Sequence, residues 1–145
     1  MPLITRRLEF DAGHRILGHE GKCRNPHGHR YVAEISVWSQ SLDPLGRVVD
    51  FSVIKEEVGG WIEKNWDHTM ILSRHDPLLK CPEIEKADKP PYIILPKPPR
   101  PESPTAEVLA EILYDVSKQL LPPHLEVRKV VLYETPNCRA EYPDQ

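Results

Sequence analysis

The sequence has no long apolar run, no excess of basic residues and no even number of cysteines. No apolar stretch approaches the roughly 18 residues that a membrane-spanning helix needs, and residues 1–7 contain no apolar segment typical of a secretory signal. The net charge of −3 argues against a nucleic-acid-binding surface. Three cysteines do not suit a closed disulfide framework and favour free thiols in a reducing compartment. We therefore expect a cytoplasmic protein that binds neither membranes nor nucleic acids.

The sequence also has no glycine-rich phosphate loop. Its 145 residues, of which 39% are hydrophobic and 28% charged, are enough for one domain with a core of its own. We expect residues 1–145 to form that single domain. Many of the sixteen prolines lie in residues 77–101, where regular structure is least expected.

Alternation of apolar and polar residues predicts the strands of this domain. In the first strand Phe10 lies on the apolar parity, and His14 shares that parity if the strand continues past Gly13 without a bulge. The predicted strands are residues 3–12, 29–39, 92–95 and 127–133.

Two helices separate these strands. Asp50 is a typical N-cap for the first helix, in which apolar residues recur at helical spacing over residues 51–62. Ser103 and Pro104 are typical of the N-cap and first position of the second helix, which Pro122 ends. The order of elements predicts an α+β fold, with a four-stranded antiparallel sheet and both helices on one face. The open edges of such a sheet favour association between copies.

Three histidines and a cysteine lie close together in the sequence. His27 and His29 are two residues apart, so in a strand both side chains lie on one face about 7 Å apart. His14, at the end of the preceding strand, can supply a third imidazole. Three neutral nitrogens with a fourth position open are typical of a catalytic zinc site. A lone His-x-His pair is more often two polar residues on a solvated face, but His14 and nearby Cys23 favour the metal site.

Cys23 is a candidate base or nucleophile, because a cation or metal beside a thiol favours the reactive thiolate. The alternative is an inert buried cysteine. Asp67 and His68 form a second candidate pair, in which the carboxylate orients the imidazole. Adjacent residues of a strand point to opposite faces, so this pair must lie in a turn or at the end of an element. The alternative is a solvated turn.

Other charged residues have both a functional and a structural interpretation. Glu107, in the first turn of the second helix, can complement the helix dipole. Glu134, at the end of the last strand, can accept two hydrogen bonds from an amidine-like edge, or can be an ordinary surface residue. Four basic residues can hold an anionic group or form a solvated face: Arg15, Lys22, Arg24 and Arg30.

Six short motifs in this order resemble the 6-pyruvoyl-tetrahydropterin synthase superfamily, and within it the 6-carboxy-tetrahydropterin synthases. The three-residue gap between Cys23 and His27 is similar to that of the carboxy-forming branch. The chain departs from the family pattern in three places. Ser103 and Trp66 replace residues common in the family, and the region of residues 81–101 is longer and richer in proline than that pattern predicts. The motifs are Phe10-Asp11-Ala12-Gly13-His14, Cys23-x-x-x-His27-Gly28-His29, Val49-Asp50-Phe51, Asp67-His68, Pro104-Thr105-Ala106-Glu107 and Glu134-Thr135-Pro136.

The resemblance implies a tunnelling fold (T-fold), in which the sheets of a homo-oligomer, commonly a hexamer, join into a barrel with active sites between subunits. It implies Zn²⁺ as the cofactor and a pterin as the substrate. The implied zinc ligands are His14, His27 and His29; the implied catalytic residues are Cys23, Asp67 and His68; the implied substrate-binding residues are Thr105, Glu107 and Glu134.

The implied reaction converts 7,8-dihydroneopterin triphosphate into 6-carboxy-5,6,7,8-tetrahydropterin, acetaldehyde and triphosphate, a step of queuosine biosynthesis. One alternative is the pyruvoyl-forming reaction or another side-chain cleavage of the same dihydropterin. A second alternative is a non-catalytic protein in which zinc stabilises an oligomer. Cys23 discriminates between the two classes, because a structural metal has no need of a thiol beside an open coordination position.

Overall fold

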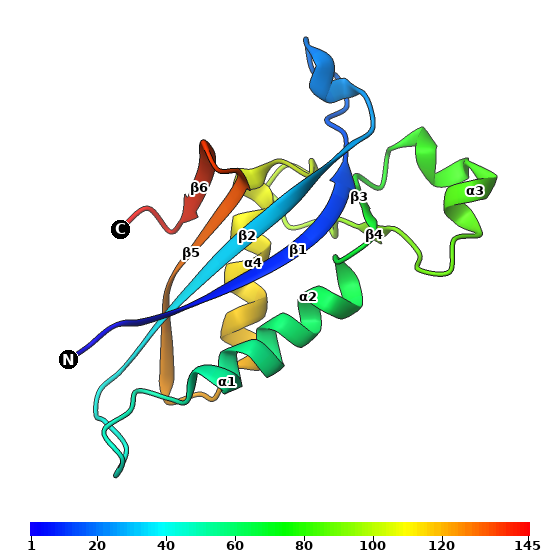
Figure 1. The fold of residues 1–145 in the computed structure, drawn as a ribbon. Helices are drawn as coiled ribbons and strands as arrows, with labels where there is room; N and C mark the ends of the chain where they lie inside the picture. The colour runs from blue at the N-terminus through cyan, green and yellow to red at the C-terminus, as the bar shows by residue number, and fades with distance from the viewer.

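Two long antiparallel strands form the centre of the sheet in the computed structural model, which describes residues 1–145. β1 (Ile4–His14) and β2 (His27–Ser39) lie side by side (Figure 1). They pair in a continuous register that ends with His14 opposite His27. No bulge interrupts β1 at Gly13, so His14 keeps the parity of Phe10 as expected. The pairing therefore carries the core face of the sheet directly into the histidine cluster.

The sheet has six strands in the order β4-β3-β1-β2-β5-β6, not the four predicted. β5 (Leu125–Thr135) pairs antiparallel with β2, and β6 (Cys138–Tyr142) pairs antiparallel with β5. β3 (Met70–Leu72) pairs parallel with β1 and with β4 (Tyr92–Ile93), so the sheet is mixed and not purely antiparallel. The prediction missed β3 and β6 because they are too short to show clear alternation. The α+β class is confirmed.

The first predicted helix is present, with an irregular middle. Asp50 caps it by accepting a hydrogen bond from the Ser52 N–H. A π-helical turn (Lys55–Gly59) connects α1 (Phe51–Ile54) to α2 (Gly60–Asn65). The residues that face the sheet keep their helical spacing through the turn and are buried: Ile54, Val58 and Ile62.

The second predicted helix begins later than the sequence indicated. α4 spans Ala106–Leu120, and its N-cap is Thr105, whose hydroxyl accepts a hydrogen bond from the Val108 N–H. The prediction of Ser103 as N-cap is wrong, because Pro104 precedes the cap and is not the first helical residue. A further short helix, α3 (Pro82–Glu85), lies in the proline-rich region beside β3 and β4 (Figure 1).

The core lies between one face of the sheet and the helices α2 and α4 (Figure 1). Phe10 stacks on Tyr31 with ring centroids 5.0 Å apart, and Trp66 packs against Phe10 at 5.7 Å. This aromatic group adjoins the histidine end of β1 and β2, because the Tyr31 ring contacts the rings of His14 and His29. None of the helices is long and apolar enough to cross a bilayer.

The outer edge of β1 is largely without a strand partner. Only Gly13 and His14 pair with β3, while Asp11 bonds to the turn that carries Asp67 and His68. The rest of this edge has no partner in the chain, a condition that favours pairing with another copy.

We expect Leu113→Ala to lower the free energy of unfolding by about 2–5 kcal/mol, because it opens a cavity in the core under the sheet. Leu113 has no exposed surface, whereas Leu120 on the same helix is 37% exposed. The control Leu120→Ala should cost less than about 1 kcal/mol. Denaturant unfolding followed by circular dichroism measures both, and equal losses would contradict this account of the core.

Candidate metal centre and active site

Three imidazoles meet where β1 ends and β2 begins. His14 lies opposite His27 in the register, and His29 follows on the same face of β2. The ring centroids are 4.6–5.1 Å apart, and one nitrogen from each ring lies within 4.8 Å of the others. The structure thus brings together the three histidines that the sequence predicted as metal ligands.

Backbone carbonyls fix the orientation of two of these rings. Nδ1 of His14 lies 2.7 Å from the Pro104 carbonyl oxygen, and Nδ1 of His27 lies 2.7 Å from that of Asn25. A carbonyl can only accept, so each Nδ1 carries the proton and each Nε2 keeps its lone pair. This arrangement, in which the non-ligating nitrogen donates to a carbonyl, is typical of metal-binding histidines.

The remaining ring nitrogens fit a bound cation. Nε2 of His14 and Nε2 of His29 are buried without a hydrogen-bond partner, which is unfavourable for a polar atom unless something else binds it. Burial lowers the pKa of both imidazoles, against the effect of the Pro104 carbonyl on His14 and of the Glu134 charge on both. Lower pKa values keep the rings neutral, the form that binds a metal. The cluster is therefore suited to hold a metal ion.

Glu134 lies directly beside this cluster. It is near the end of β5, which pairs with β2, and its Oε1 lies 3.3 Å from Nε2 of His29, within ion-pair distance but without hydrogen-bond geometry. Its side chain is 24% exposed, so one carboxylate remains accessible at the edge of the histidine cluster. The sequence analysis placed Glu134 at a strand end, and the structure shows that this end adjoins the three histidines.

Tyr31 is a site feature that the sequence analysis missed. Its ring contacts the rings of His29 and His14 edge-on, with centroids 5.5 and 6.0 Å apart. The residue is fully buried and its hydroxyl has no hydrogen-bond partner. Burial raises the pKa of this phenol, with a further contribution from the Glu134 charge, so it remains protonated. Its parity with His29 was the only sequence signal for this position.

Cys23 lies on the loop between β1 and β2, in a 3-10 turn (Lys22–Arg24). Its thiol is free and half-buried, and the backbone of the turn is tied to Ile16 by a hydrogen bond of 2.9 Å. Its sulfur is not part of the compact group formed by the histidine nitrogens. The loop leaves and re-enters the sheet at the histidine pair, so Cys23 belongs to the same end of the molecule.

Thr105 and Glu107 have different environments at the start of α4. Thr105 is half-buried as the N-cap and follows Pro104, whose carbonyl holds His14. Glu107 is exposed in the first turn and makes no hydrogen bond or ion pair within the chain. It is the second residue of the helix, a position where a carboxylate complements the helix dipole.

Asp67 and His68 form a hydrogen-bonded pair in the turn after α2, as their adjacency required. Oδ2 of Asp67 lies 2.8 Å from Nδ1 of His68, and Oδ1 accepts the Asp11 N–H at 2.9 Å. Burial alone would raise the pKa of Asp67, but these hydrogen bonds hold it below its usual value. The carboxylate therefore stays ionised and orients the His68 ring, which is 73% exposed.

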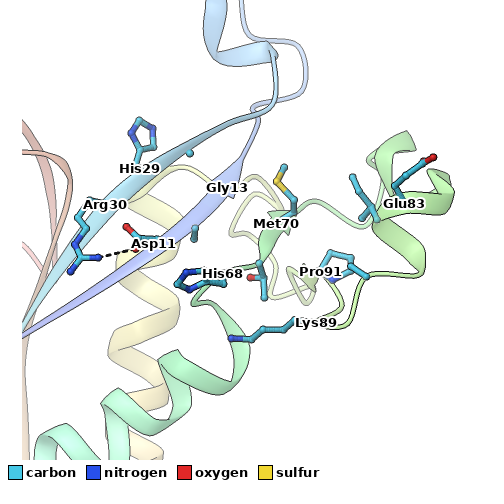
Figure 2. Close-up of a pocket in the computed structure, with 14 residues that line it drawn as sticks. Asp11, Gly13, His29, Arg30, His68, Met70, Glu83, Lys89 and Pro91 are labelled. Atoms are coloured by element: carbon cyan, nitrogen blue, oxygen red, sulfur yellow. Dashed lines mark hydrogen bonds and ion pairs between the residues drawn. The ribbon is translucent and has the colours of Figure 1, made fainter.

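His68 lines an open cleft of about 560 Å³ between the β1–β2 end and residues 83–91 (Figure 2). The cleft is walled by Gly13 and Met70 on one side and by Lys89 on the other. His29 also borders it, but the rings of His29 and His68 do not point toward each other (Figure 2). Within one chain, His29 and His68 thus border the same cleft without their rings meeting.

Two of the four basic residues are already paired within the chain. Arg15 binds the buried carboxylate of Asp76 through Nε at 2.9 Å. Arg30 lies between Asp11 and Glu9, at 2.8 and 3.1 Å. An anionic ligand at the histidine cluster would therefore have to compete with carboxylates for these two guanidinium groups.

The amino-acid sequence of this chain matches known proteins over nearly the whole length of the chain. The model of the family described as 6-pyruvoyl tetrahydropterin synthase matches residues 3–145. The chain belongs to this family. The resemblance stated from the motifs is thereby confirmed.

Two relatives in the family carry the same name. A protein named 6-carboxy-5,6,7,8-tetrahydropterin synthase from Rickettsia bellii is 41% identical, and the match covers 94% of this chain and 96% of that one. A protein of the same name from Aquifex aeolicus is 34% identical over 98% of both chains. This chain therefore spans nearly the full length of both relatives.

Solved structures confirm the fold of the family. An uncharacterized protein from Wolinella succinogenes has a TM-score of 0.81 at 21% identity, with 99% of this chain and 98% of that one covered. The 6-pyruvoyl tetrahydropterin synthase of Caenorhabditis elegans has a TM-score of 0.65 at 26% identity, with 98% and 96% covered. The predicted T-fold is the fold of this chain.

We expect His27→Ala to lose the bound divalent metal, because two imidazoles cannot replace the full ligand set. The matched control is His75→Ala, which removes an exposed histidine away from the cluster. Metal content per chain, measured by elemental analysis after dialysis, should fall at least about tenfold in His27→Ala only. Full metal content in His27→Ala would show that the ligand set is wrong.

Proposed function

We propose that this protein is a zinc-dependent carbon–carbon lyase that converts 7,8-dihydroneopterin triphosphate and water into 6-carboxy-5,6,7,8-tetrahydropterin, acetaldehyde and triphosphate. The observation that carries the proposal is an accessible carboxylate, Glu134, beside three imidazoles whose free nitrogens converge. The family and the name of its relatives supply the substrate class. The product would enter queuosine biosynthesis.

His14, His27 and His29 would hold the zinc ion. When bound, zinc acts as a Lewis acid that makes a C–H beside a coordinated hydroxyl easier to deprotonate. Three nitrogen ligands suit zinc, and they leave a coordination position for substrate. The His14 and His27 rings donate hydrogen bonds to the carbonyls of Pro104 and Asn25, which keep both rings directed at one point.

Glu134 would bind the pterin ring. Its carboxylate can accept two hydrogen bonds from the N–C–NH₂ edge of a pterin, and this would place the side chain of the substrate toward the histidines. The half-buried Thr105 and the exposed Glu107 would border the substrate from the start of α4. Tyr31, buried and protonated beneath His29, makes this part of the pocket rigid.

Cys23 and the Asp67–His68 pair would move protons. Cys23, as thiolate, would take a proton from the substrate side chain, and His68 would exchange a proton at another of its carbons or oxygens. Asp67 keeps the Nδ1 of His68 protonated, so that Nε2 is the atom available to substrate. Two separate proton-transfer groups suit a reaction that must oxidise one side-chain carbon and reduce another part of the molecule before cleavage.

The active site would be completed by a second copy of the chain. In one chain, the His68 ring does not point toward His29 across the cleft that both border, and β1 has an unpaired edge beside the Asp67–His68 turn. Pairing of sheets at that edge would bring His68 of one subunit to the metal centre of its neighbour. A barrel-forming homo-oligomer, such as a hexamer, is the assembly that supports this arrangement.

We expect Cys23→Ala to retain zinc and assembly but to lose at least about 100-fold in kcat, because the proton-abstracting group is gone. The control is Cys138→Ala, an exposed thiol on β6. Mass spectrometry of products from dihydroneopterin triphosphate measures turnover. Acetaldehyde with carboxypterin supports the proposal, and a pyruvoyl-pterin product would instead assign the pyruvoyl-forming reaction. Undiminished turnover in Cys23→Ala would remove the thiol from the mechanism.

We also expect Cys23→Ala and His68→Ala, each inactive alone, to restore activity when co-assembled. Random mixing gives both wild-type residues to about a quarter of the sites if the two come from different subunits. Specific activity of the co-expressed mixture measures this. No recovery in a mixture shown by mass spectrometry to contain hetero-oligomers would place both residues of a site in one subunit.

A further inference from the structure

We propose that Lys89 is a positioning residue that holds the Asp67–His68 turn in its active shape. This inference rests on the proposed function, because it concerns the proton-transfer pair of the same site. Lys89 does not touch the substrate in this account. It acts on the backbone that carries His68.

The Asp67–His68 turn needs stabilising contacts from other segments because its backbone conformation is unusual. His68 has a φ of +58°, the left-handed region that residues with a side chain rarely adopt. The N–H of His68 donates to the Asp11 carbonyl at 2.6 Å, and the Thr69 hydroxyl donates to the Trp66 carbonyl at 2.8 Å. These bonds engage the His68 N–H and the Trp66 carbonyl. They leave the Asp67 carbonyl, which immediately precedes the left-handed residue, to be satisfied from elsewhere.

Lys89 supplies that contact from a distant part of the sequence. Its Nζ donates to the carbonyl oxygens of Asp67 and Glu63. Glu63 lies in the last turn of α2, so one ammonium group joins the end of the helix to the turn that follows. A cation there also complements the negative end of the helix dipole.

The surroundings of Lys89 differ from those of its neighbours. Lys89 is half-buried, whereas Lys86, three residues earlier, is exposed and has no side-chain partner. In Figure 2 the Lys89 side chain extends from the segment beside Pro91 toward the turn below His68. The segment between β3 and β4 therefore reaches the Asp67–His68 turn through the Lys89 side chain.

The chemical consequence concerns the direction of the His68 ring. Asp67 binds Asp11 and His68 through its two carboxylate oxygens, so the carboxylate can orient the imidazole only while the turn keeps its shape. The positive charge of Lys89 also favours the ionised form of Asp67, in the same direction as the hydrogen bonds. Loss of Lys89 should therefore misplace His68 without affecting the zinc ligands or Glu134.

The test compares Lys89→Met with the matched control Lys86→Met, both in the assembled protein with dihydroneopterin triphosphate as substrate. We expect Lys89→Met to lower kcat by at least about tenfold with KM nearly unchanged, because a small displacement of a proton-transfer group slows the chemistry. Zinc content should remain full. Lys89→Arg, which keeps the charge and donors, should recover part of the loss, and Lys86→Met should behave like the wild type.

Hydrogen exchange gives a readout that is independent of turnover. In Lys89→Met, amides of residues 66–69 should exchange at least about tenfold faster than in Lys86→Met, because the turn opens more often. Unchanged exchange would overturn the proposal, and so would faster exchange with an unchanged kcat, which would make Lys89 merely structural. If the wild type does not convert this substrate, the proposed function fails, while exchange still decides whether Lys89 holds the turn.

Discussion

The register between β1 and β2 is the constraint on which the site depends. His14 stands opposite His27, and His29 follows on the same face, only because the two strands pair without a bulge from Ile4 to the end of β1. A slip of one residue would send the imidazoles of one strand to the other face of the sheet. The apolar residues on that face favour this register, because a one-residue slip of either strand would turn Phe10 or Tyr31 out of the core. The core thus determines the geometry of the histidine cluster.

Side-chain pattern was sufficient to predict much of this molecule. The alternation in residues 3–12 and 29–39 indicated the two central strands, and the parity of His14 with Phe10 indicated a shared face. The adjacency of Asp67 and His68 required a turn, which the structure contains. Glu134 was placed at a strand end by its pattern alone. Each of these features depends on the local period of the chain, which a single sequence displays directly.

Other features depend on atoms that carry no sequence signal. The carbonyls of Pro104 and Asn25 orient His14 and His27, yet every residue has a carbonyl. The contact of Lys89 with the Asp67 turn joins segments more than twenty residues apart, and nothing in residues 80–91 indicates it. Strands as short as β3 show no period, and their place in the sheet follows from tertiary pairing. The N-cap of α4 was misplaced because two hydroxyl residues flank Pro104, and packing decides between them.

The hydrogen bond from His14 to Pro104 joins the histidine cluster to the beginning of a helix. Pro104 immediately precedes the Thr105 cap, so the same short stretch of backbone both orients the His14 ring and starts α4. A metal ion bound at the three histidines would therefore be thermodynamically linked to the first turn of α4. A substitution that frays this turn would weaken metal binding from a distance, and bound metal would stabilise the turn in return. Substitutions at Pro104 or Thr105 would therefore change metal affinity while all three imidazoles stay the same.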